Sequence, residues 1–249
     1  MNPTGRFTDR AADYAAGRPS YPDAALDAIF TGMGDPATLT IADLGAGTGI
    51  SSRILADRGA RVLAIEPNAA MRESAVPHER VTFVAATAEA TGLEEADVDV
   101  VTVFQAFHWF DHRRALREIV RILRPGGRAA AVYNERDESD AFTAEYGELV
   151  RRYHTDDTEL RRADGLEAFI AFEGWHAPRT VRVSNAQELD REGLLARARS
   201  TSYLPKEGRS AGELYAELER LFVRYARDGH VTMALQTIVA RGDTGGDGG

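Results

Sequence analysis

The sequence has 249 residues, of which 43% are hydrophobic, and it carries a formal net charge of −9 at pH 7. This length favours a single domain with an elaboration, and the acidic charge argues against nucleic acid as a partner. The chain has no cysteine, which excludes disulfide bonds and thiolate chemistry, and its polar residues 1–10 and short apolar runs predict a cytoplasmic protein without a signal peptide or membrane contact.

The first half of the chain alternates apolar runs with helical or turn sequence. Strands are predicted at about 39–44, 61–66, 81–85, 98–105 and 128–133. Such alternation is typical of βαβ units and a parallel sheet. Before the last of these strands, Asp111 is expected to cap a helix that Pro125, Gly126 and Gly127 end. The apolar face of this helix is predicted to consist of Leu116, Ile119, Val120 and Leu123.

The second half adds helices and two further strands. Residues 139–173 have a helical pattern with one aromatic-rich face: Phe142, Tyr146, Leu149, Val150 and Tyr153. Val181 and Val183 suggest a sixth strand, and a helical stretch follows at about 190–199. Residues 210–213 (Ser-Ala-Gly-Glu) have the sequence of a capping box. The helix that it would open has these inward-facing residues: Leu214, Leu218, Leu221, Phe222 and Tyr225. Residues 231–240 are predicted to form a last strand.

The most informative segment is a glycine-rich turn that runs from Asp43 to Gly49, between an apolar run and helical sequence. Glycines let the backbone adopt positive φ and let a ligand lie against the main chain. The free N–H groups of the following helix suit an anionic or polar ligand. Glu66 ends the next apolar run, where an acid accepts both hydroxyls of an adenosine ribose. The pattern therefore predicts a ligand such as NAD, FAD or S-adenosylmethionine (SAM).

The spacing of the glycines separates these ligands. A dinucleotide fingerprint G-x-G-x-x-G that begins at Gly45 would need glycine where Ile50 stands. Asp43 would repel a pyrophosphate, whereas it favours the ammonium group of an amino-acid cofactor, directly or through water. SAM therefore fits the turn better than NAD.

Together these motifs resemble those of the class I (Rossmann-like) SAM-dependent methyltransferases. Residues 43–49 resemble the first motif of that family and Glu66 its ribose-binding acid; residues 86–89 resemble the adenine-contacting turn, with Thr87 where many relatives have aspartate. Residues 105–110 resemble the segment beside the methionine part of the cofactor, and residues 123–127 the helix exit before the fifth strand. The resemblance covers about residues 7–135 and continues more loosely through Tyr203 to the last strand, as in the small-molecule (type 11-like) branch.

The resemblance implies an α/β fold, a doubly wound, mostly parallel seven-stranded sheet with an antiparallel last strand and a helical insertion after the fifth strand. Residues 1–241 would form one SAM-binding domain, in which residues 1–30 are a helical lid and residues 139–176 line the substrate pocket. The Gly- and Asp-rich residues 242–249 are expected to be a disordered tail.

The resemblance also implies a set of site residues. The predicted cofactor-binding residues are Tyr14, Arg18, Asp43, Gly45, Ala46, Gly47, Gly49, Glu66, Pro67, Met71, Thr87, Ala88, Glu89, Gln105, Ala106 and Trp109. Within this set, Tyr14 and Arg18 would meet the methionine carboxylate, unless the N-terminal helix packs for stability alone. The predicted substrate-binding residues are Tyr21, His108, Asn134 and Tyr146.

His108 is the catalytic candidate, because it is the one histidine expected at the mouth of the site. It would act as a general base, or it would only orient the loop or stack under the cofactor. Trp109 and Phe107 either face the sulfonium of SAM or pack in the core. No metal site is predicted, since His108 and His112 lack a third ligand.

Four hypotheses for function follow. The leading one is transfer of the SAM methyl group to a small-molecule acceptor, such as a carboxylic acid or a secondary metabolite, with S-adenosylhomocysteine (SAH) as product. The second keeps the fold and the cofactor but catalyses a cyclisation, elimination or pericyclic step, because fold does not fix chemistry. A non-catalytic binding subunit is disfavoured by the intact glycine turn and Glu66, and an NAD enzyme by Ile50.

Overall fold

The computed structural model describes residues 19–201 and 203–246, and these contain a seven-stranded sheet in the order β3-β2-β1-β4-β5-β7-β6. Strands β1 to β5 are parallel, whereas β7 runs antiparallel to its neighbours β5 and β6. The bounds are Thr40–Leu44 (β1), Arg61–Ile65 (β2), Val81–Val84 (β3), Val98–Phe104 (β4), Leu123–Arg136 (β5), His176–Leu189 (β6) and Val231–Asp243 (β7). The predicted fold class is confirmed.

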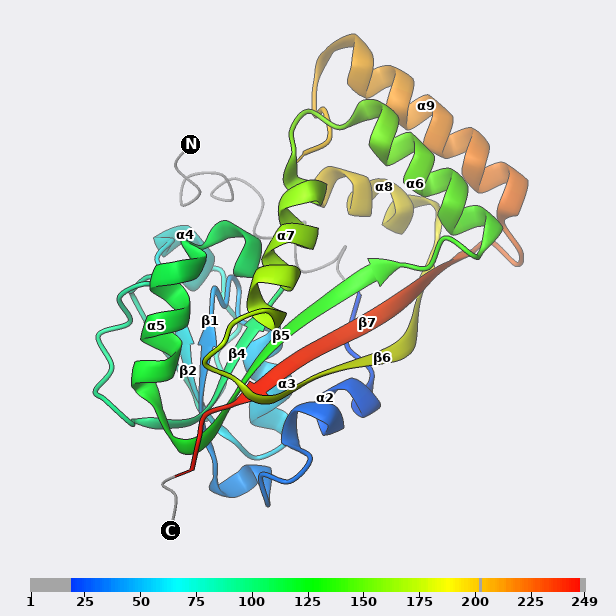
Figure 1. Ribbon diagram of the computed structural model, residues 1–249. Helices are drawn as coiled ribbons and strands as arrows, with labels where there is room; N and C mark the ends of the chain where they lie inside the picture. Colours follow the sequence, from blue (N-terminus) through cyan, green and yellow to red (C-terminus); the bar gives the residue numbers. More distant parts are fainter. Residues whose placement is uncertain (1–18, 202, 247–249) are drawn as a thin grey trace.

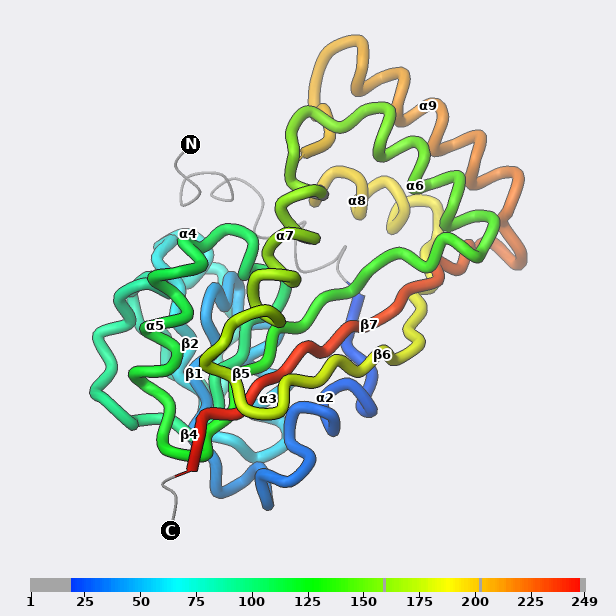
Figure 2. Tube along the Cα trace, in the orientation of Figure 1, coloured from blue at the N-terminus to red at the C-terminus, as the bar shows by residue number. Residues whose placement is uncertain are grey.

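Helices cover both faces of the sheet and form a separate group at one end of it (Figures 1 and 2). The α-helices are Asp23–Phe30 (α2), Ile50–Asp57 (α3), Ala69–Glu73 (α4), His112–Ile122 (α5), Ala141–Tyr153 (α6), Thr158–Ile170 (α7), Arg191–Ser200 (α8) and Gly208–Tyr225 (α9). Two short 3₁₀ helices, η2 (Pro36–Thr38) and η3 (Phe107–Trp109), lie in the connections. None of the described helices combines the length and the apolar character that a membrane span requires.

The alternation of side chains along β1 explains why both faces of the sheet are covered. Ile41 faces a core that includes Ile29 of α2 and Leu55 of α3, whereas Ala42 faces a core that includes Ile119 of α5. Because helices cover both faces, successive strand residues are apolar, as is typical of parallel sheets. The apolar runs recognised in the sequence are therefore the central strands.

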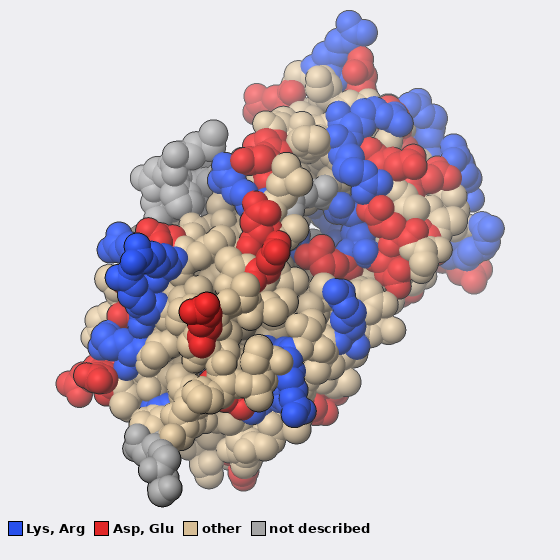
Figure 3. All heavy atoms as spheres, viewed as in Figure 1, with Lys and Arg blue, Asp and Glu red and all other residues tan. Residues whose placement is uncertain are grey.

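Helices α6, α8 and α9 form a helical cap beyond the end of β5 (Figure 1). A third apolar core lies between them and the adjoining ends of β6 and β7, and it includes Phe142, Leu194, Leu218 and Met233. In the face shown in Figure 3, acidic and basic side chains alternate over this cap. Exposed ion pairs of this kind each contribute little, so the cap is held mainly by its apolar core.

Two helix predictions need correction. Asp111 caps α5 as predicted, since its carboxylate accepts from the backbone N–H of Arg114 at 3.1 Å. The buried face of α5, however, contains Ile122 rather than Val120, which is 36% exposed, and Leu123 already begins β5. The helix ends at Ile122, before the stop predicted at residues 125–127, and Leu123 pairs with Val98 in the sheet.

The capping box predicted at residues 210–213 does not form. Helix α9 begins at Gly208, whose φ of +79° glycine adopts without steric cost, and no side chain caps it. The carboxylate of Glu213 instead pairs with Arg209 one turn earlier, at 2.7 Å. The predicted inward face is correct at Leu214, Leu218 and Leu221, which are buried.

The tail predicted to be disordered from residue 242 is ordered for its first residues. Strand β7 continues to Asp243, because that carboxylate pairs with Arg128 of β5 at 2.5 Å and Arg128 is almost buried. The backbone N–H of Thr244 then donates to the carbonyl of Gly127 at 2.8 Å. Residues 247–249 lie outside the described residues.

The predicted N-terminal lid is corrected in part. Residues 1–18, including Tyr14 and Arg18, lie outside the described residues. Residues 23–30 form α2, whose Ala25, Leu26 and Ile29 pack against the sheet and not over the site. Apolar spacing of three and four residues favours burial on a sheet over a lid position.

Candidate cofactor and acceptor site

Two cavities open at the carboxyl ends of the parallel strands, where open α/β sheets bind ligands. The smaller has a volume of about 170 Å³ and the larger about 300 Å³. The smaller is lined by Gly45, Gly47, Glu66, Pro67, Asn68, Met71, Thr87, Ala88, Glu89, Phe104, Gln105, Ala106, Trp109 and Phe110. The larger lies between the strand ends, α7 and the helical cap.

The structure brings most of the predicted cofactor residues together at the smaller cavity. The exceptions are Ala46, which lines the larger cavity, Gly49 and Asp43, which line neither, and Tyr14 and Arg18, which lie outside the described residues. All four predicted substrate residues line the larger cavity: Tyr21, His108, Asn134 and Tyr146. Their roles in binding stay predictions.

The backbone geometry of the turn explains why glycines occupy three of its positions. Gly45, Gly47 and Gly49 have φ of +70°, +57° and +75°, a region that side chains other than glycine rarely adopt. A Cβ on Gly45 would lie 2.7 Å from the Cβ of Ala106, and one on Gly49 would lie 2.8 Å from Phe83. A Cβ on Gly47 would meet no atom within 4 Å, so Gly47 alone of the three faces open space.

The side chain of Asp43 lies beneath the turn, and its predicted role toward the cofactor, directly or through water, stays a prediction. Its side chain is fully buried, and its carboxylate accepts from the hydroxyls of Ser51 and Ser52, both at 2.7 Å, and of Thr102 at 2.9 Å. The carboxylate thereby ties the end of β1 to the start of α3 and to β4. Hydroxyl residues directly after the turn were the signal for this role.

The buried position of Asp43 predicts a pH effect on stability. Burial raises the pKa of the Asp43 carboxyl above its ordinary value, although the hydroxyl contacts oppose the shift. A raised pKa in the folded state means that stability is lost as the pH rises from about 4 through that pKa. The side chain of Asp43→Asn does not titrate, so this variant should not lose stability in that way. Its free energy of unfolding, relative to that of the wild type, should therefore increase from about pH 4 to about pH 8. Urea unfolding at both pH values tests this, and a constant difference would contradict it.

Glu66 connects the turn to the end of β2. Its Oε2 accepts from the backbone N–H of Gly47 at 2.9 Å, and its Oε1 accepts from that of Asn68 at 2.8 Å. The carboxylate also lines the smaller cavity, and a carboxylate has about four lone-pair positions. It can therefore hold the turn and accept further hydrogen bonds from a ligand.

Two residues of the smaller cavity were missed in the sequence, Asn68 and Phe104, whereas Phe110 belongs to the segment 105–110 that the resemblance placed beside the cofactor. Asn68 caps α4, because its side chain accepts from the N–H of Met71 at 3.3 Å. Its position two residues after Glu66, just before a helix, was a usable signal. Phe104 ends an apolar strand, and nothing in the sequence distinguishes it from the strand core.

His108 lies in η3, in the wall of the larger cavity, and its side chain is largely buried. Its Nδ1 is 3.4 Å from the hydroxyl of Tyr133, and α7 approaches closely at Gly165. Burial raises the pKa of the Tyr133 phenol, which therefore stays protonated at neutral pH. Among the described residues, no group of three or more candidate ligands that could hold a metal ion surrounds this histidine or any other site.

The two cavities share part of their walls. The residues common to both are Gly45, Gly47, Phe104, Gln105 and Trp109. Gln105 has a φ of +57°, a strained conformation for a residue with a side chain, and its Oε1 accepts from Arg162 of α7 at 3.0 Å. The strained residue thus stands where a ligand in one cavity would meet a ligand in the other.

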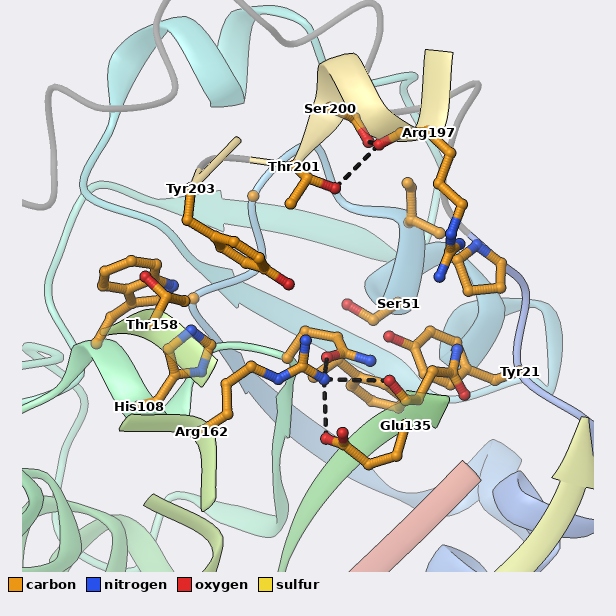
Figure 4. A pocket seen from close by; sticks show the side chains of 18 of the residues that line it. Tyr21, Ser51, His108, Glu135, Thr158, Arg162, Arg197, Ser200, Thr201 and Tyr203 are labelled. Carbon is orange, nitrogen blue, oxygen red and sulfur yellow. Dashed lines mark hydrogen bonds and ion pairs between the residues drawn. The ribbon is translucent and has the colours of Figure 1, made fainter. Parts of the chain in front are cut away.

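The larger cavity also contains residues that the sequence did not single out. Arg162 of α7 and Arg197 of α8 both point toward it, together with Thr158 and Tyr203 (Figure 4). Arg162 pairs with Glu135 at 2.9 Å. Because these residues come from separate helices after β5, spacing in the sequence did not reveal that they meet.

Comparisons with known proteins agree with this geometry. A family model described as a methyltransferase domain matches residues 42–131. An uncharacterized methyltransferase of Mycobacterium tuberculosis is 40% identical over 149 residues, which is 59% of this chain and 59% of the relative. An uncharacterized methyltransferase-like protein of Schizosaccharomyces pombe is 34% identical over 152 residues, 60% of this chain and 59% of the relative. The matches thus span less than two thirds of these relatives.

A structural comparison extends over more of the chain. The fold is similar to a candidate type II methyltransferase from Anaeromyxobacter dehalogenans, with a TM-score of 0.67 and 26% identity. The match covers 92% of this chain and 99% of that one, so it includes the sheet and the regions after β5. Residues 42–131 thus match the methyltransferase domain, and the fold of the chain is similar to that of a methyltransferase.

Proposed function

We propose that this protein transfers the methyl group of SAM to a small-molecule acceptor and releases SAH. The observation that carries the proposal is the junction of the two cavities at Gln105, Trp109 and Gly47. A cofactor held in the smaller cavity and an acceptor held in the larger one would meet there, and holding two reactants together lowers the barrier to reaction.

The residues of the smaller cavity fit the cofactor. The open space at Gly47 lets a ligand lie against the turn, and the carboxylate of Glu66 is available to ribose hydroxyls. Met71 and Ala88 offer apolar wall for an adenine ring, with Thr87 and Glu89 beside them. When bound, SAM supplies a methyl group on a positively charged sulfur, for which the aromatic face of Trp109 is a suitable neighbour.

Within this proposal, His108 acts as the general base for an acceptor that must lose a proton. Its ring lies in the wall of the larger cavity beside the Tyr133 hydroxyl, which fixes the imidazole. Positioned bases contribute about 100-fold or more to rate. His108→Gln should therefore lower kcat by about 100-fold and leave SAH affinity unchanged. An unchanged kcat would show that His108 only packs the wall.

A label-transfer assay tests the proposal. Purified protein is incubated with SAM labelled in the methyl group and with pools of small organic acids, phenols and amines, with RNA and an unrelated protein as control acceptors. We expect label in the small-molecule fraction and in neither control, together with a product that has gained one methyl group. Conversion of a substrate without a gain in mass would instead support a cyclisation, elimination or pericyclic step.

A further inference from the structure

The guanidinium of Arg162 is held rigidly in the wall of the larger cavity. Its Nη2 donates to Gln105 Oε1 at 3.0 Å, to the carbonyl of Asn134 at 3.1 Å and to Glu135 Oε1 at 2.9 Å. Its Cζ lies 5.5 Å from the centre of the Tyr133 ring, which adds a cation–π contact. The cation is therefore oriented before any ligand arrives.

Two nitrogen atoms of the Arg162 guanidinium, Nε and Nη1, make no hydrogen bond to the described residues. Of the two, Nε is buried. A buried polar group without a partner is uncommon and calls for an explanation. Figure 4 shows the guanidinium projecting among the lining residues, with the Tyr203 hydroxyl directed into the same space. A ligand with a suitable acceptor atom would use this capacity.

The charge of the wall favours an anionic ligand. The described charged residues that line the larger cavity are three arginines (Arg136, Arg162 and Arg197) and one glutamate (Glu135). The whole chain, in contrast, has a formal net charge of −9. A positive wall within a negative protein focuses the field on the cavity and attracts anions to it.

We propose that the acceptor is an organic acid and that Arg162 binds its carboxylate. This deepens the proposed methyl transfer and rests on it. Guanidinium groups match carboxylates in geometry and charge, and such bonds are about twice as strong as neutral ones. Because Arg162 is bonded to Gln105 at the junction, the bound carboxylate holds the acceptor beside the cofactor. The cavity volume of about 300 Å³ lies in the range of sites that bind small molecules.

The first test is calorimetric titration of the SAH-saturated protein with succinate, glutarate, cinnamate and 3-phenylpropionate, each compared with its neutral amide. We expect at least one acid to bind about tenfold or more tightly than its amide, because hydrogen bonds to a charged group are stronger than those between neutral groups. That preference should disappear in Arg162→Gln and survive in part in Arg162→Lys. If none of the acids is preferred by the wild-type complex, the proposal is wrong.

A matched control is Arg152→Gln. Arg152 lies on the outer side of α6, where it pairs with Glu217 at 2.8 Å, and it does not line the larger cavity. This variant also removes one guanidinium and one ion pair, so it should keep the full preference for the acid. Loss of the preference in Arg152→Gln as well would attribute the effect to net charge and overturn the proposal.

Arg162 could bind the carboxylate of the methionine part of the cofactor instead of an acceptor carboxylate. Titrations with SAH and with 5′-methylthioadenosine, which lacks the amino acid, separate the two sources. We expect Arg162→Gln to bind both compounds as the wild type does. A loss of SAH affinity alone would assign Arg162 to the cofactor and overturn the proposal. Failure of the wild type to bind SAH would overturn the proposed function itself.

Discussion

Glu66→Gln should lower the affinity for SAH by about 100-fold. The variant keeps the size of the side chain but removes the charge that would accept from two ribose hydroxyls, and each charged hydrogen bond contributes about 1.5–3 kcal/mol. It also loses one of the two oxygens that accept from Gly47 and Asn68, so the turn itself becomes less well held. Isothermal titration calorimetry with SAH measures the change.

The control for this prediction is Glu73→Gln. Glu73 is the last residue of α4 and is close in sequence to Met71, which lines the smaller cavity. Glu73 itself is exposed and does not line that cavity. It should bind SAH as tightly as the wild type. Equal affinity of Glu66→Gln and Glu73→Gln would show that Glu66 holds the turn without contacting the cofactor.

The second large effect distinguishes two glycines of the same turn. Gly45→Ala should lower the free energy of unfolding by roughly 2–5 kcal/mol, from the left-handed backbone and from overpacking. Its Cβ would lie 2.7 Å from Ala106 Cβ, which cannot rotate away. Gly47→Ala has no such contact and should lose only about 1–2 kcal/mol. Chemical denaturation measures both values.

For SAH binding, in contrast to stability, we expect a large effect from Gly47→Ala. The new methyl group of Gly47→Ala would enter space that both cavities share, so a folded variant should bind SAH about tenfold or more weakly, on the scale of an overpacked contact. Full SAH affinity in folded Gly47→Ala would place the cofactor away from the turn.

Site residues could be predicted from the sequence where they directly follow a strand of the parallel sheet. The glycine turn, Glu66 and Gln105 each follow an apolar run, and the parallel sheet brings the ends of such runs to one edge. For this reason most of the predicted cofactor residues lie in one cavity. Asn134 was placed near the site by the same reasoning, and Tyr21 and Tyr146 were placed there by the family resemblance; all three line the larger cavity.

What the sequence did not show depends on tertiary contacts. The sequence did not reveal that Ser51, Ser52 and Thr102 donate to the carboxylate of Asp43 inside the core. Arg162 was not considered, since its partners Gln105, Asn134 and Glu135 are distant in the sequence. Helix ends were misjudged for a related reason: at Glu213, an ion pair with Arg209 replaced the expected cap. Local sequence patterns do not predict which of several possible partners a polar side chain will bind.

Calorimetric titration of the wild-type protein with SAM, SAH and NADH tests whether the junction of the two cavities serves a sulfonium cofactor. We expect saturable binding of SAM and SAH, with one site per chain, and no binding of NADH, because the turn lacks the third glycine of the dinucleotide fingerprint at Ile50. Binding of NADH alone, or of none of the three, would contradict the proposed methyl transfer.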